Sequence, residues 1–444
     1  YHRLISLNGV RFYPRSFVSS INAFHHDNRQ RLSDWPHAMV TTSTHDSKRG
    51  EDVRARINVL SELPREWQQH LARWRRVNRS KKRLVGEARS PSRNDEYLLY
   101  QTLLGTWPLE PLDPGGLAAF RERIEAYMIK AIREAKVNTS WMNRNKDYEE
   151  AVRHFVRALL DDPDRNPFLA DFLPFQQRVA GFGLLNSLSQ VLLKLTVPGV
   201  PDIYQGNELW AFNLVDPDNR RPVDYRHRQA LLETLDASCR DRDSLAALLR
   251  ELLDGIADGR AKLYVTWKTL SLRSTHARLF AEGQYLELPS EGPRADHVCA
   301  FARRCEDNEA LVVAPRWFAR LGTDSGKLTD SSAVWGGTRV RCSESPRLSG
   351  YRNVLTDETV QAQQHRDCAW LNAADLLRSF PVALLLREPP GAAAATTASE
   401  TECRREQFKR SCNGVWGAVP MVMSGAEVDP NAEAQVTCRE NNSS

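Results

Sequence analysis

The first half of the chain carries apolar side chains at helical spacing, interrupted by proline-containing breaks. Apolar residues recur every three or four positions in segments 53–60, 120–131 and 152–159. The breaks fall at residues 64, 91–92, 111–116 and 163–167. We therefore expect residues 51 to about 195 to be mostly helical.

Two short β-prone runs flank this helical block. Residues 38–42 form the first run and residues 199–204 the second, after a proline and a glycine typical of a helix-to-strand turn. A polar cluster follows each run directly. Strands that alternate with helices and carry polar residues at their C-terminal ends are typical of a (β/α) barrel, which places its chemistry at that end.

The residue pattern changes after about residue 260. Short β-prone runs separated by turn residues there predict a small antiparallel β-domain. From Pro389 the sequence becomes low in complexity and shows no periodicity, so we expect a disordered or loosely attached tail. The predicted strands of the β-domain include residues 298–302, 310–314, 338–341, 351–355 and 382–386.

The polar cluster after the first run contains His45 and Asp46, with Lys48 and Arg49 close behind. Two interpretations are open. Ser43 and Asp46 have the spacing of a helix-capping box, and on the pattern alone a helix start is the more common meaning. The charged residues 48–56 would then be a solvated helix face. In the second interpretation the cluster binds a polyhydroxyl ligand such as a sugar. A carboxylate can then bridge two adjacent sugar hydroxyls, while imidazole and ammonium groups donate hydrogen bonds to others.

The cluster after the second run offers Gln205 and Glu208, although a glutamate after a strand is more often a turn residue. Aromatic rings match the apolar face of a sugar. The aromatic candidates for such stacking are Tyr204, Trp210, Trp107 and Trp141, although each is more commonly a packing residue. The turn-rich segment 216–222 either has a structural role or lines the barrel mouth.

Composition narrows the functional classes. A net charge of +5 from 61 basic and 56 acidic residues, with no sustained basic block, argues against nucleic acid as the main partner. The longest apolar run, residues 182–200, contains several polar residues and is not expected to span a membrane. Eight scattered cysteines form no C-x-x-C pair, which indicates reduced thiols in the cytoplasm and no zinc site. No phosphate-binding loop or cofactor motif is present, so we expect no cofactor and no metal.

Several segments together resemble the maltooligosyl trehalose synthases, a family within the α-amylase-type glycoside hydrolases. The resemblance covers residues 3 to about 388. The segments that carry it are 41–56, 93–103, 133–136 with 139–141, 166–169, 195–209 and 214–224. Asn138 departs from this pattern, because the family usually has a histidine before the Thr-Ser-Trp sequence.

The resemblance implies the C-terminal part of a (β/α)8 TIM barrel with a large helical insertion, followed by a small antiparallel β-domain. It places the seventh-strand His-Asp motif in residues 1–50, the insertion in 51–180 and the last barrel strand with its helices in 181–258. The β-domain would occupy 259–388 and the tail 389–444.

The implied reaction is an intramolecular transglucosylation that converts the reducing-end α-1,4 bond of a maltooligosaccharide to an α,α-1,1 bond. The implied catalytic residue is Asp46, which would hold the distorted sugar and stabilise the oxocarbenium-like transition state. The implied substrate-binding residues are His45, Lys48, Arg49, Gln205 and Glu208.

A retaining double displacement needs two further carboxylates, and this part of the sequence departs from the family. The only acidic residues in segment 1–36 are Asp27 and Asp34, and neither has the family's surrounding motif. Residues 7–14 also differ from the family's substrate loop. We therefore expect a C-terminal fragment that is inactive alone. The alternatives are another α-glucan hydrolase or transglycosidase, or a non-catalytic carbohydrate-binding remnant.

Overall fold

The computed structural model describes residues 20–162, 165–239, 242–322, 331–343, 350–365 and 368–388. The chain divides into two compact units, residues 1–388 and 389–444. The expectations for the loop at 7–14 and for the tail at 389–444 lie outside the described residues.

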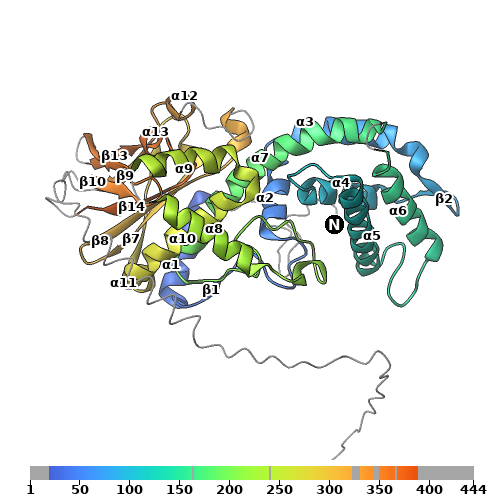
Figure 1. Cartoon of the computed structure of the whole chain (residues 1–444), viewed down its shortest axis with the longest axis horizontal. Coiled ribbons are helices and arrows are strands. Elements are labelled where there is room, and N and C mark those ends of the chain that lie inside the picture. Colours follow the sequence, from blue (N-terminus) through green and yellow to red (C-terminus); the bar gives the residue numbers. More distant parts are fainter. Residues whose placement is uncertain are drawn as a thin grey trace, which may run out of the picture. The chain divides into compact units, whose positions relative to one another are not determined.

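Helices make up most of the chain up to residue 281 (Figure 1). The longer ones are α1 (Ile21–Asp34), α2 (Glu51–Val59), α3 (Pro64–Val77), α4 (Arg93–Thr106), α5 (Pro114–Ala135), α6 (Lys146–Leu159), α7 (Pro167–Thr196), α8 (Tyr225–Ser238), α9 (Arg242–Asp254) and α10 (Arg260–Thr275). The short ones are α11 (Ala277–Ala281), α12 (Ser331–Trp335), α13 (Ala373–Leu376), η2 (Arg79–Lys81), η3 (Asp218–Arg220), η4 (Ile256–Asp258), η5 (Ala295–His297) and η6 (Phe318–Leu321).

The predicted apolar stripes lie on α2, α5 and α6, and their side chains are buried. Most of the predicted breaks are helix starts. Proline occupies the first turn of α3, α5 and α7, where its missing N–H has no helical partner to lose. The sequence therefore places the boundaries of the helical block well.

Helix α7 is the central helix of this fold and contacts α2, α10 and the β-domain (Figure 1). By length and composition alone it could cross a membrane, but 78% of its most apolar window is buried inside the structure. A Cβ on Gly183 would lie 2.5 Å from Cγ of Arg56, so this glycine allows α7 and α2 to approach closely.

The two β-prone runs that flank the helices form a parallel pair. β1 (Met39–Val40) pairs with β4 (Val200–Pro201), with Met39 opposite Val200. Gly199, at φ +117°, lies so close to the Ala38 carbonyl that a Cβ there would be 2.6 Å from its oxygen. Because the strands are parallel, the polar segments that follow them leave the pair at the same end.

The β-domain contains two antiparallel sheets, of order β11-β10-β14-β8-β7-β5 and β12-β13-β9-β6. Each predicted strand of this domain overlaps an observed one. The strands are β5 (Gln284–Glu287), β6 (Ser290–Glu291), β7 (Val298–Cys305), β8 (Asn308–Pro315), β9 (Arg339–Ser343), β10 (Gly350–Asn353), β11 (Thr359–Gln361), β12 (Gln363–His365), β13 (Cys368–Asn372) and β14 (Ala383–Arg387).

Two features of this region and of the helical block differ from the sequence expectation. The first strand of the β-domain begins at Gln284, because residues 260–281 form α10 and α11, and α10 packs on α7. A hairpin of β2 (Arg83–Val85) and β3 (Ala88–Ser90), turning at Gly86 with φ +58°, interrupts the helical block. Runs of three residues are too short for a periodic pattern to reveal.

The hydrophobic core continues from the helices into the β-domain. One cluster joins buried residues of the helical block, such as Trp74 and Phe172, to strand residues such as Leu311. A second cluster joins the C-terminal half of α7 to α9, α10 and the other face of β8. The β1–β4 pair is therefore fixed to a packed body through α7.

Candidate functional site

The segment after β1 is a loop that turns at His45 and Asp46, and helix α2 begins only at Glu51, with Gly50 as its N-cap. The interpretation of Asp46 as a helix cap is therefore wrong. Ser43 Oγ instead accepts a hydrogen bond from the Glu51 N–H, at 2.9 Å. The Gly50 N–H bonds the Asn213 carbonyl, which fixes the end of the loop before the helix starts.

The side chains of His45 and Asp46 are open to solvent. Their exposed fractions are 57% and 67%, and Nε2 of His45 lies 3.3 Å from Oδ2 of Asp46. A carboxylate that is this exposed keeps most of its acceptor positions available. The pair can therefore bind a polar ligand without first breaking a buried contact.

Asn219, in η3, joins the two segments that follow β1 and β4. Its Nδ2 donates to the His45 carbonyl at 2.8 Å and to the Thr44 carbonyl at 3.3 Å. The backbone carbonyl of Asn219 accepts hydrogen bonds from the Tyr204 hydroxyl at 3.1 Å and from Gln205 Nε2 at 3.3 Å. Asn219 is buried, and these bonds are partly buried. No sequence pattern singles out Asn219, which lies in the turn-rich segment 216–222 that was expected either to have a structural role or to line the barrel mouth.

Gln205 and Glu208 lie after β4, within this cluster. The Gln205 side chain is exposed. Glu208 is partly buried and accepts from Nε of Arg228 at 3.0 Å, while Nη2 of Arg228 donates to the Gly206 carbonyl at 3.1 Å. Arg228 therefore fixes the turn that carries both predicted binding residues.

Lys48 and Arg49 differ in their surroundings. Lys48 is partly exposed, and its Nζ lies 3.1 Å from Glu134 Oε2 on α5. Arg49 is buried, with its guanidinium 4.4 Å from the centre of the Tyr127 ring and its Nη2 donating to Thr102 Oγ1 at 3.3 Å. Arg49 also bridges to Leu214, so its contacts hold the loop rather than face solvent.

Helix α5 runs along the segments that build this site. Arg123 pairs with Asp218 at 2.7 Å, and Lys130 Nζ donates to the Asp216 carbonyl at 2.6 Å. Glu134 then binds Lys48 one turn further on. One face of α5 thus contacts both the 216–218 turn and the loop after β1.

Behind the loop lies a buried cluster of opposite charges. Lys262 Nζ is 2.8 Å from both Glu51 Oε1 and Asp52 Oδ2, and Lys194 Nζ is 3.2 Å from Glu51 Oε2. Asp52 also accepts from the Ala211 N–H at 2.8 Å, and Thr42 donates to Glu51. The expectation of a solvated helix face is wrong, because α2 packs against α7 and α4, and its two carboxylates pair with Lys194 of α7 and Lys262 of α10.

The protonation states in this cluster follow from the pairing. Burial alone would raise the pKa of Glu51, but the ammonium groups of Lys262 and Lys194 outweigh it and lower that pKa. Burial alone would lower the pKa of Lys262, whereas Asp52 and Glu51 raise it. Glu51 and Lys262 therefore stay charged at neutral pH, and the cluster joins the loop after β1 to α2, α7 and α10.

The aromatic candidates separate by exposure. Trp107 is buried in the core. Trp210 is partly buried, and its indole N–H donates to the Ile256 carbonyl at 2.6 Å. Trp141, in the loop between α5 and α6, is 54% exposed.

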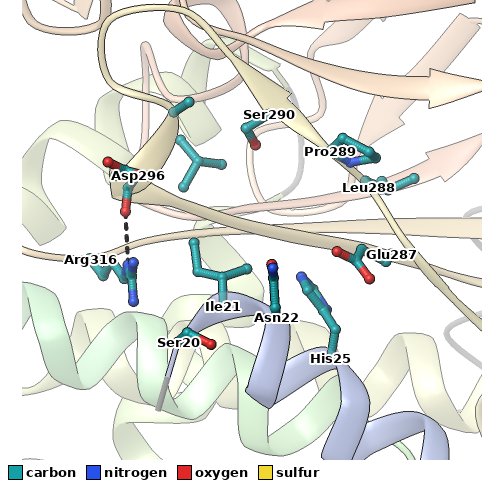
Figure 2. A pocket seen from close by; sticks show the side chains of 12 residues that line it. Ser20, Ile21, Asn22, His25, Glu287, Leu288, Pro289, Ser290, Asp296 and Arg316 are labelled. Carbon is teal, nitrogen blue, oxygen red and sulfur yellow. Dashed lines mark hydrogen bonds between the residues drawn. The ribbon is translucent and has the colours of Figure 1, made fainter. Parts of the chain in front are cut away.

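A cavity of about 400 Å³ lies elsewhere, between α1 and the β-domain. Figure 2 shows His25 and Asn22 of α1 facing Glu287, with Arg316 bonded to the Asp296 carbonyl. The His25 ring bonds the Tyr285 hydroxyl at 2.6 Å. None of the residues that line this cavity belongs to the His45–Asp46 site. Within the described ranges, no group of three or more His, Cys, Asp or Glu side chains is arranged to hold a metal ion.

Comparison with known proteins identifies relatives of this chain in sequence and in structure. A curated protein of Mycobacterium tuberculosis named maltooligosyl trehalose synthase is 38% identical over 320 residues, which are 72% of this chain and 36% of that protein. The solved maltooligosyltrehalose synthase of Arthrobacter ramosus is 31% identical with a TM-score of 0.68, over 87% of this chain and 43% of its own. The chain is a homologue of the maltooligosyl trehalose synthases.

A further solved maltooligosyl trehalose synthase gives a TM-score of 0.64 at 32% identity, over 87% of this chain and 45% of its own. The chain matches no family model. It spans about a third of the curated synthase's length and under half of each solved synthase. The resemblance of the sequence to this family is confirmed.

Proposed function

We propose that this chain supplies part of the active site of a maltooligosyl trehalose synthase. The reaction is the conversion of the reducing-end α-1,4 bond of a maltooligosaccharide to an α,α-1,1 bond. The observation that carries the proposal is the exposed His45–Asp46 pair, tied through Asn219 to the segment after β4. The homology to the synthases supports the choice of reaction.

Asp46 is the proposed catalytic carboxylate. Its exposed oxygens can accept hydrogen bonds from two adjacent hydroxyls of one glucose ring, and its negative charge stabilises the positive charge that develops at the anomeric carbon. The Asn219 bonds to the backbone of Thr44 and His45 hold this carboxylate in place before substrate arrives. Such preorganisation means that little reorganisation is needed during the reaction.

The remaining predicted residues fall into two groups. His45, Lys48 and Gln205 have polar atoms near solvent, so we assign them to sugar hydroxyls, and Glu208 to the same surface through its open side. Arg49 is buried against Tyr127, so we assign it to holding the loop on which Asp46 and Lys48 lie.

We further propose that β1 and β4 are neighbouring strands of the catalytic (β/α)8 barrel of an α-amylase-type enzyme. The parallel register of β1 and β4 and the site at their C-terminal end support this assignment. A retaining mechanism needs a nucleophile and an acid/base about 5 Å apart. We assign both carboxylates to parts of the polypeptide outside these residues, and the chain alone is then inactive. The cytoplasm is the proposed location.

The test is a product analysis on the full-length protein. Incubation with maltopentaose should remove reducing ends without releasing glucose, because the product is a non-reducing trehalosyl oligosaccharide of the same length. Mass spectrometry and a reducing-end assay follow both quantities. Release of glucose or shorter maltooligosaccharides as the main products would show an ordinary hydrolase or transglycosidase instead. Binding of maltopentaose without any turnover would indicate a carbohydrate-binding remnant.

A further inference from the structure

We propose that Trp141 forms an additional glucan-binding subsite, in which its indole ring stacks on a glucose unit of the chain whose end is held at Asp46. The inference rests on the proposed function, because the ligand is the same maltooligosaccharide. It adds a residue that sets the preferred length of the substrate.

The first observation is an indole ring left open. Trp141 is 54% exposed, and Met142 and Val137 of the same loop are also strongly exposed. Contiguous exposed apolar surface on a folded protein marks a site for a ligand or partner. A flat indole beside polar groups suits a pyranose ring, which presents C–H bonds on its faces and hydroxyls around its edge.

The second observation is that this loop is firmly anchored. Glu149, at the start of α6, accepts from Arg133 at 2.6 and 2.8 Å, from Arg144 at 2.9 Å and from Thr139 Oγ1 at 2.9 Å. Thr139 Oγ1 in turn accepts from the Asn145 N–H at 3.0 Å. The residues on both sides of Trp141 are therefore tied to one buried carboxylate, and the exposed ring is presented in a fixed position.

The third observation connects the ring to the candidate site. The guanidinium of Arg133 lies 4.8 Å from the centre of the Trp141 ring and holds it by a cation–π contact. The next residue of α5, Glu134, binds Lys48, two positions after Asp46. The last turn of α5 thus carries both the support of Trp141 and a contact to the catalytic loop.

This connection favours a glucan over a protein partner as the occupant. An oligosaccharide bound at Asp46 must extend away from it across the surrounding surface, and α5 joins that surface to the indole. Because an oligosaccharide is a string of similar rings, each further aromatic platform adds affinity only for chains long enough to reach it.

The experiment compares Trp141→Ala with Trp141→Phe in the full-length protein, using maltooligosaccharides of three to seven glucose units. Trp35, exposed before β1 at the opposite end of that strand from Asp46, provides the matched control Trp35→Ala. We expect Trp141→Ala to raise KM for the longest substrates roughly tenfold with kcat unchanged, which corresponds to about 1.4 kcal/mol, within the range of such ring contacts. Trp141→Phe should retain most of the affinity, and Trp35→Ala should match the wild type.

An unchanged KM at every chain length in Trp141→Ala would overturn the subsite. So would an equal loss for all lengths, or a change in oligomeric state, which would mark the surface as a protein interface. Calorimetric titration with maltoheptaose separates this inference from the proposed function. If the wild type does not isomerise but binds maltoheptaose, and Trp141→Ala weakens binding tenfold, the reaction is wrong and the subsite stands. Equal binding by both proteins refutes the subsite whatever the reaction is.

Discussion

One short segment of this chain, residues 42–56, contains two aspartates in opposite environments. Asp46 lies in the loop after β1 with 67% of its side chain exposed, and its partner His45 is 57% exposed. Asp52, six residues later, is 1% exposed and pairs with Lys262 at 2.8 Å. The residue types are the same, but the first keeps its hydrogen-bonding capacity and the second has used it inside the protein.

This difference separates function from architecture within a single motif. A buried charge is tolerated only when it is paired and hydrogen-bonded, so the cluster around Lys262 fixes how α2, α7 and α10 meet. An exposed carboxylate contributes little to the free energy of folding and is available to a ligand. Mutations should therefore affect stability at one end of the segment and activity at the other.

The largest effect on stability is expected from Lys262→Met. The change leaves Glu51 and Asp52 buried without their shared cation, and breaking a buried ion pair in this way costs about 3–5 kcal/mol. Denaturant unfolding of the full-length protein measures the cost. Lys146→Met, at an exposed position in the first turn of α6, is the control and should change the free energy of unfolding by less than about 0.5 kcal/mol. A loss of less than about 1 kcal/mol in Lys262→Met would contradict the assigned role of the cluster.

The loss of stability in Lys262→Met should also depend on pH. In the wild type the lysines hold the pKa of Glu51 at about 2, below its usual 4.5, although burial alone would raise it. The stability that Glu51 contributes is therefore complete above pH 4.5 and is lost as the pH falls toward 2. Without Lys262 this depression is relieved, and the cost of the mutation should be smaller at pH 4 than at pH 7. An equal cost at both pH values would argue against an electrostatic origin.

A smaller, mixed effect is expected from Asn219→Ala. The change removes the two hydrogen bonds to the Thr44 and His45 carbonyls, and each lost hydrogen bond costs about 0.5–1.5 kcal/mol. Because these bonds position Asp46, kcat/KM for maltopentaose should fall about tenfold or more even at temperatures where the variant is folded. Asn22→Ala, on the exposed surface of α1, should leave both stability and activity unchanged. Unaltered kinetics in Asn219→Ala would remove it from the site.

Much of this arrangement is readable from the sequence because it depends on local signals. The apolar stripes gave the helices around Ile57, Ile124 and Phe155, and the prolines gave their starts. The polar clusters after two short strands placed His45 and Gln205 near one another, and the structure joins them through Asn219. A sequence pattern can therefore predict which residues follow the end of a strand and that two such strands lie side by side.

The burial of the charged segment could not be read in the same way. Glu51 and Asp52 have the composition of a solvated helix, and their buried charges are balanced by Lys194 on α7 and Lys262 on α10. Those partners lie more than a hundred residues away in sequence, so no local pattern contains them. The capping-box spacing of Ser43 and Asp46 misled for the same reason, since Ser43 bonds the N–H of Glu51 across a longer loop.

The most direct test of this account compares Asp46→Asn with Asp52→Asn in the full-length protein, measuring kcat on maltopentaose and the midpoint of thermal unfolding for each. We predict that Asp46→Asn lowers kcat at least about 100-fold, as loss of a transition-state-stabilising group does, and leaves the midpoint within about 1 °C. Asp52→Asn should lower the midpoint by several degrees. Wild-type activity in Asp46→Asn, or a lower unfolding midpoint in Asp46→Asn than in Asp52→Asn, would contradict the division between an exposed catalytic carboxylate and a buried structural one.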